Sequence, residues 1–134
     1  MTAERVMIVN ADDFGLSPGV NAGVVKAHEE GILTSASLMV RGRAARDAAA
    51  YARGTPSLSL GLHVDLGEWE YIKGDWRERY KLFAPGDHAG ARAETRAQLE
   101  LFRGLTGSDP THIDSHQHLH VGTFATEALA QLGR

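Results

Sequence analysis

The sequence has no cysteine among its 134 residues, which excludes disulfide bonds, thiolate nucleophiles and cysteine-based zinc sites. It also lacks a signal-peptide apolar segment and any apolar run near the roughly 18–20 residues that cross a bilayer, so we expect a cytoplasmic protein that binds no membrane. Positive charge is in short supply, with 14 Lys and Arg against 17 Asp and Glu; this argues against a protein that binds nucleic acid by neutralising phosphates. Histidine, by contrast, is abundant: there are seven, four of them between His112 and His120.

Apolar runs alternate with helical patterns along the chain. The run from Arg5 to Asn10 has no polar alternation, which predicts a strand buried on both faces. Ser17 followed by Pro18 predicts the start of a helix that ends before Gly31. The same order recurs three times. Further strands are predicted at residues 34–40 and 58–66, a fourth strand with its outgoing loop at 111–120, and further helices at 44–53, 91–105 and 124–132.

Four strand–helix units in this order predict an α/β fold with a parallel sheet, because each crossover returns the chain to the same side. A closed eight-stranded α/β barrel takes about 250 residues, so this chain forms either a small open sheet or half of a barrel. Without an internal repeat or a linker, we predict one domain over residues 1–134. Residues 67–90 are expected to form a long irregular loop, whose aromatic side chains either cover the core or stack on a sugar.

Polar residues follow three of the predicted strands, at the edge of a parallel sheet where ligands bind. They are Asp12 with Asp13 after the first strand, His63 with Asp65 at the end of the third, and the run from His112 to His120 in the fourth. Since successive strand residues point to opposite faces, Asp12 and Asp13 are expected to have different roles, one binding a cation and the other accepting a proton. An Asp with two His suits a divalent ion that activates water, and Mg²⁺, Mn²⁺, Co²⁺ and Zn²⁺ all fit such ligands.

Strand geometry limits how many histidines can bind one ion. In the last run every even position is His or Asp, so an extended strand would carry five ionisable groups on one face. Side chains two apart lie about 6.6 Å apart, so one or two of these histidines at most are ligands and the others have different roles. Structural alternatives exist for the earlier residues: Asp12 and Asp13 also suit a turn or helix cap, and His63 also suits a hydrogen-bonded core position.

Four segments together resemble the YdjC-like carbohydrate deacetylases, a family that includes chitooligosaccharide deacetylases. They are Asn10–Ser17, Gly31–Ser35, Gly61–His63 and Pro110–His120. The resemblance implies a distorted (β/α) barrel and metal-dependent hydrolysis that removes the N-acetyl group of an amino sugar or chitooligosaccharide. It also implies a homodimer. Family members are usually around twice as long as this chain, which corresponds to about half a barrel. A natural fragment, a truncated chain and a half-barrel completed by a partner copy all agree with that length.

The resemblance also implies roles for individual residues. Asp13, His63 and His116 match the ligands of one divalent metal ion, Mg²⁺ or Zn²⁺, with Mn²⁺ or Co²⁺ as alternatives. Asp12 matches the general base and His120 the group that protonates the leaving amine. His118 and Asp114 are expected to contact the substrate. Two other hypotheses remain open: a half-barrel that binds metal or sugar without catalysis, and a metal-dependent hydrolase of another amide or ester.

Overall fold

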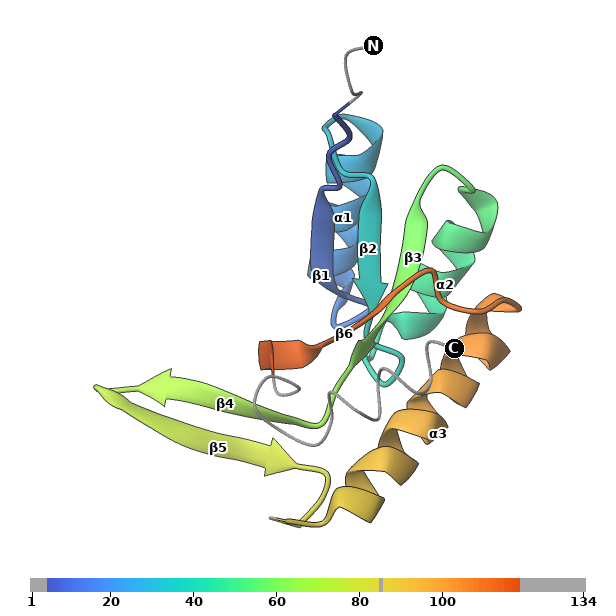
Figure 1. Cartoon of the computed structure of the whole chain (residues 1–134). Coiled ribbons are helices and arrows are strands. Elements are labelled where there is room, and N and C mark those ends of the chain that lie inside the picture. Colours follow the sequence, from blue (N-terminus) through green and yellow to red (C-terminus); the bar gives the residue numbers. More distant parts are fainter. Residues whose placement is uncertain (1–4, 85, 119–134) are drawn as a thin grey trace.

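The computed structural model describes residues 5–84 and 86–118, and its centre is a four-stranded parallel sheet (Figure 1). The strands are β1 (Asn10–Phe14), β2 (Ser35–Leu38), β3 (Ser59–Val64) and β6 (Ile113–Ser115), in the spatial order β1-β2-β3-β6. The predicted α/β class with parallel βα units is therefore confirmed. The sheet that the described residues form is open, with β1 and β6 at its edges.

Three helices connect the strands: α1 (Pro18–Glu29), α2 (Ala45–Gly54) and α3 (His88–Thr106). Each of the predicted helices in the described residues is confirmed; the helix predicted at 124–132 lies outside them. Ser17 caps α1 as expected, since its Oγ accepts from the backbone N–H of Val20 at 3.2 Å and Pro18 follows. No helix in the part of the chain that the structure describes is long and apolar enough to cross a membrane.

The helix-facing side of the sheet holds the core. Alternate residues of β2 and β3 are apolar and buried, among them Leu38, Leu62 and Val64, each with no exposed surface. They pack in one cluster with Phe14 and with side chains of all three helices. Because side chains alternate along a strand, the residues between them, such as Ser37 and His63, project from the opposite side of the sheet. That side carries the polar groups.

The first strand starts later than the sequence predicts. The expected buried strand over residues 5–10 is wrong, because β1 begins at Asn10 and Val6, Met7 and Ile8 are 86, 70 and 78% exposed. The reason is the position of its neighbour. β2 begins at Ser35, and backbone hydrogen bonds between the two segments start at the carbonyl of Val9, which accepts from residues 34 and 35. Earlier residues have no neighbouring strand to pair with in the part of the chain that the structure describes.

The expected irregular loop over residues 67–90 is also wrong, since most of it is an antiparallel hairpin of β4 (Gly67–Ile72) and β5 (Asp75–Lys81). Lys73 and Gly74, which join the strands, have φ values of 51° and 89°, as a two-residue hairpin turn requires. Lysine is an unusual residue for the first position, so the turn gives a weak sequence signal. The hairpin projects from the body (Figure 1). Tyr71 and Trp76 are 61 and 64% exposed on it, so they do not cover the core.

Candidate metal centre

Strand register brings polar side chains together on the side of the sheet opposite the core. His63 of β3 lies beside Asp114 of β6, and Ser37 of β2 lies beside Gly61 of β3. These residues come from three strands that are far apart in the sequence and adjacent in the sheet. The expectation that the strand ends meet is therefore confirmed for the described residues.

A bulge in β1 determines where Asp12 and Asp13 point. Ala11 pairs with Ala36 and Phe14 with Leu38, so two aspartates occupy the space opposite the single residue Ser37. Asp13 has a left-handed backbone (φ 60°), which is a common way to accommodate the extra residue of a bulge. The two aspartates do not face opposite sides, because this bulge interrupts the alternation and both carboxylates approach His63. The different roles expected of Asp12 and Asp13 stay predictions.

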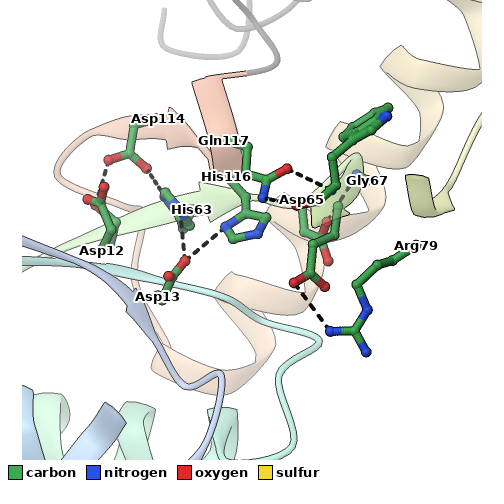
Figure 2. Close-up of polar contacts among 12 residues, drawn as sticks. Asp12, Asp13, His63, Asp65, Gly67, Arg79, Asp114, His116 and Gln117 are labelled. Atoms are coloured by element: carbon green, nitrogen blue, oxygen red, sulfur yellow. Dashed lines mark hydrogen bonds and ion pairs between the residues drawn. The ribbon is translucent and has the colours of Figure 1, made fainter. Parts of the chain in front are cut away.

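Asp13, His63 and His116 form a cluster, which we call the metal-centre cluster (Figure 2). Asp13 Oδ1 lies 3.3 Å from His63 Nε2 and 2.9 Å from His116 Nδ1. One potential ligand atom from each residue lies within 4.8 Å of the other two. The His63 side chain is 3% exposed and that of His116 is 12% exposed, so water has little access to either ring.

Asp114 determines which nitrogen of His63 carries hydrogen. Its Oδ1 lies 2.6 Å from His63 Nδ1, and because a carboxylate can only accept, Nδ1–H is the donor. The other nitrogen, Nε2, then faces Asp13. Ser37 holds the carboxylate in turn, since its hydroxyl donates to Asp114 Oδ2 at 2.7 Å. Metal-binding histidines usually have this arrangement, in which the second ring nitrogen donates to a carboxylate.

The strand of the histidine run is shorter than its alternation predicts. β6 ends at Ser115, and residues 116–118 form a short 3₁₀ turn in which Gln117 and His118 have φ values of 52° and 54°. Within the described residues, the expectation of one extended face of ionisable groups is wrong, because the strand ends at Ser115 and this turn brings His116 towards Asp13. His118 is described and exposed, whereas His120 lies outside the described residues.

His112 hydrogen-bonds to residues next to the metal-centre cluster. Its Nε2 lies 3.0 Å from the Ser37 hydroxyl and its Nδ1 lies 2.9 Å from the Thr111 hydroxyl. Because Ser37 gives its one hydrogen to Asp114, Nε2 of His112 donates to Ser37. The ring also covers Gly61 so closely that a Cβ there would lie 2.3 Å from Nε2. A glycine is therefore required beneath the ring.

The charges of the site favour a cation. Burial lowers the pKa of His63, but its hydrogen bond to Asp114 and the surrounding negative charges outweigh burial and raise it above the usual 6.5. Burial raises the pKa of Asp114, but the hydrogen bonds from His63 and Ser37 outweigh it and bring that pKa below the usual 3.8. A second group also converges here, because single ligand atoms of Asp12, His63 and Asp114 lie within 4.8 Å of one another. The carboxylates of Asp12, Asp13 and Asp114 therefore surround the His63 imidazole with negative charge.

The metal-centre cluster has the donors that a divalent ion needs. One carboxylate and two imidazoles, converging from β1, β3 and the turn after β6, are suitable ligands for Zn²⁺ and related ions. The hydrogen bond from His63 to Asp114 adds the outer support that such ligands usually have. The residues present therefore fit a bound metal ion.

Comparison with known proteins identifies the family of the chain. The family model described as YdjC-like protein matches residues 6–134. The chain belongs to the YdjC-like family. Chitooligosaccharide deacetylase of Serratia marcescens is 39% identical over 130 residues, covering 88% of this chain and 51% of the relative. Carbohydrate deacetylase of Oceanobacillus iheyensis is 34% identical over 138 residues, covering 94% of this chain and 60% of the relative.

A solved structure has a similar fold. The crystal structure of a "putative cellobiose-phosphate cleavage protein" from Enterococcus faecalis V583 superposes with a TM-score of 0.74 at 27% sequence identity, covering 95% of this chain and 54% of that chain. This YdjC-like chain thus spans about half the length of the curated relatives it matches. The superposition shows that the α/β architecture extends over almost all of this chain.

Sequence reasoning missed three polar residues around the metal-centre cluster. Ser37 is one, although its place between Ala36 and Leu38 in an apolar strand signals a polar side of the sheet. Asn10 is the second: its Nδ2 donates to Asp12 Oδ1 at 2.9 Å and to the Ser37 hydroxyl at 3.0 Å. The third, Gln117, contacts the hairpin, and no sequence pattern signals that contact.

Proposed function

We propose that this chain carries the metal centre of a carbohydrate deacetylase, a hydrolase that removes N-acetyl groups from amino sugars or chitooligosaccharides. The observation that carries the proposal is Asp13 Oδ1 lying between His63 Nε2 and His116 Nδ1, at 3.3 and 2.9 Å. The names of the relatives, chitooligosaccharide deacetylase and carbohydrate deacetylase, support the substrate class. Asp13, His63 and His116 would hold the ion.

The chain's own residues supply the remaining chemistry. When bound, a divalent ion lowers the pKa of water and polarises a carbonyl group. Asp12 is the proposed general base, which takes a proton from the water that attacks the acetamide carbonyl. Its Oδ1 accepts a hydrogen bond from Asn10 at 2.9 Å, which orients the carboxylate. His120 is the proposed acid that protonates the departing amine, and the products are acetate and a free amino sugar.

The finer parts of the proposal concern the ion, the substrate and the assembly. The ligand set accepts Mg²⁺, Zn²⁺, Mn²⁺ or Co²⁺. Contacts of His118 and Asp114 with the sugar, a homodimer and a cytoplasmic location stay predictions. Asp114 has a further role in this proposal, because its hydrogen bond with His63 positions a ligand.

A second function is supported by the open sheet. Because the described strands leave β1 and β6 as free edges and the chain spans about half of its relatives, a metal-binding unit without turnover is the alternative. A deacetylation assay on N-acetylated chitooligosaccharides, with EDTA or with each divalent ion added back, separates the two. A panel of other amide and ester substrates tests for a hydrolase of different specificity.

Two variants test the residue roles directly. His116→Ala is expected to lose the stoichiometric ion, whereas His88→Ala, which removes an exposed imidazole from α3, is expected to keep it. Asp12→Asn is expected to keep the ion and lose turnover. Metal content and calorimetric titration measure the first effect and acetate release the second. Retention of one ion per chain in His116→Ala would refute the ligand assignment, and normal turnover in Asp12→Asn would refute the base.

A further inference from the structure

One side chain joins the hairpin to the segment that carries His116. Gln117 Oε1 accepts from the backbone N–H of Trp69 at 2.8 Å, and Gln117 Nε2 donates to the carbonyl of Trp69 at 2.8 Å (Figure 2). We call this pair of hydrogen bonds the Gln117–Trp69 bridge. The carboxamide thus satisfies both backbone groups of one β4 residue, as a neighbouring strand would. Since Gln117 directly follows His116, the bridge acts beside a candidate metal ligand.

The turn that carries the bridge is held from two sides. Gln117 has a left-handed backbone (φ 52°, ψ 27°), and so has His118 (φ 54°). Such conformations are unfavourable for residues other than glycine and persist where surrounding contacts hold them. On one side, His116 Nδ1 lies 2.9 Å from Asp13. On the other side, the Gln117–Trp69 bridge holds the hairpin. The position of His116 therefore depends on both contacts.

The hairpin needs anchors of its own. A two-stranded hairpin is marginally stable alone, and this one projects from the body (Figure 1). At the base of β5, the Tyr80 hydroxyl donates to Asp65 Oδ2 at 2.6 Å, and neither residue belongs to the metal-centre cluster. On the β4 side, the backbone N–H of Gly67 also donates to Asp65, at 3.1 Å, and further along the strand the Gln117–Trp69 bridge holds Trp69. The hairpin is thus anchored both beside a candidate ligand, through Gln117, and apart from the candidate ligands, through Asp65.

We infer that Gln117 is a positioning residue that couples the metal centre to the hairpin. An ion bound by His116 holds the turn in place and so stabilises the bridge, and the intact bridge in turn holds His116 in the binding geometry. This coupling is reciprocal by thermodynamic necessity. The inference rests on the proposed role of His116 as a ligand. The position of the hairpin beside the site is therefore held more firmly when the centre is loaded.

Two Gln117 variants and one matched control test the coupling in the 134-residue chain. Gln117→Met keeps the length of the side chain but removes both hydrogen bonds, and Gln117→Glu keeps the acceptor for Trp69 N–H but removes the donor to its carbonyl. Tyr80→Phe removes the hydrogen bond from β5 to Asp65 without touching the turn. The probe is Zn²⁺ alone. Calorimetry measures its affinity, and amide hydrogen exchange measures protection of β4 with and without Zn²⁺.

Zn²⁺ is expected to slow exchange of the Trp69 amide in the wild type. Gln117→Met is expected to lose that effect and to bind Zn²⁺ at least about fivefold more weakly, the low end of ordinary coupling between sites. Gln117→Glu, which keeps one of the two hydrogen bonds, is expected to show a Zn²⁺ affinity and a Trp69 protection between those of the wild type and Gln117→Met. Tyr80→Phe raises exchange in β5 but keeps the wild-type affinity and the Zn²⁺ effect on Trp69. Unchanged exchange in β2 and β3 shows that each variant is folded.

Three results overturn the inference, and they differ in what else they refute. If the wild type binds Zn²⁺ and Gln117→Met matches it in both affinity and β4 protection, the coupling alone is wrong. The same holds if Tyr80→Phe weakens Zn²⁺ binding as much as Gln117→Met, because general loosening of the hairpin then explains the effect. If the wild type binds no Zn²⁺, the ligand set and the coupling are both wrong.

Discussion

Replacing Asp114 with asparagine removes a carboxylate that supports a candidate ligand. Asp114 accepts from His63 Nδ1 at 2.6 Å and from the Ser37 hydroxyl at 2.7 Å. Asparagine offers one acceptor oxygen and a donor amide in place of two acceptor oxygens. The asparagine side chain has no second oxygen, so it cannot accept from His63 and Ser37 through separate oxygens. It also carries no negative charge to favour the form of His63 in which Nδ1 is protonated. The orientation of His63 is therefore weakened, although every proposed ligand is still present.

The expected magnitude follows from measured effects of such supporting partners, whose loss weakens metal binding by about 10- to 100-fold. That range corresponds to about 1.4–2.8 kcal/mol of binding free energy. We expect the upper part of the range, because His63 is 3% exposed and water has little access to replace the lost acceptor.

Calorimetric titration with Zn²⁺ measures the effect, and Asp12→Asn is the matched control. Asp12 also lies close to His63 and Asp114, so both variants remove one negative charge from the same site. Asp12, however, is hydrogen-bonded to Asn10. A loss in Asp114→Asn that exceeds the loss in Asp12→Asn about tenfold supports the positioning role. Equal affinities in the two variants would show that only net charge matters and would refute the reasoning.

Two further predictions concern stability. Because the pKa of His63 is raised above 6.5, the metal-free chain gains stability that is fully present below pH 6.5 and is lost as pH rises through the raised pKa. Urea unfolding in EDTA should therefore show a steeper loss of stability above pH 6.5 in the wild type than in Asp114→Asn, and parallel curves would contradict this. Gly61→Ala places a Cβ against His112 and should lower the free energy of unfolding by about 1–3 kcal/mol. Gly104→Ala, in open space on α3, should raise the free energy of unfolding by about 0.5–1 kcal/mol. Thermal unfolding measures both variants, and equal melting temperatures would refute the steric reasoning.

Several elements could be predicted because their signals are local. The cap at Ser17 with Pro18 lies within one turn of the helix that it starts, and the apolar residues of β2 and β3 report burial directly. The hairpin could not be predicted equally well. Its turn depends on Lys73 adopting a left-handed backbone, which the residue type disfavours and which pairing of the two strands compensates.

The candidate site, too, was predictable in part from the sequence and in part only from the structure. The structure places Asp13, His63 and His116 close together, and their role as ligands stays a prediction. The face that each side chain takes was not predictable by strand alternation, because alternation assumes an unbroken strand. A bulge at residues 12 and 13 and a turn at residue 116 both interrupt it. Ser37 and Gln117 act through partners distant in the sequence.

By itself the sequence determined the three helices, the central strands β2 and β3 and the chemistry available at the strand ends, because hydrophobic periodicity, caps and residue types act over a few neighbouring residues. Only the tertiary structure decided where β1 begins, which way its two aspartates point and how His116 turns towards them. Those features depend on which strand lies alongside and where its pairing starts and stops, and no short segment of the chain contains that information.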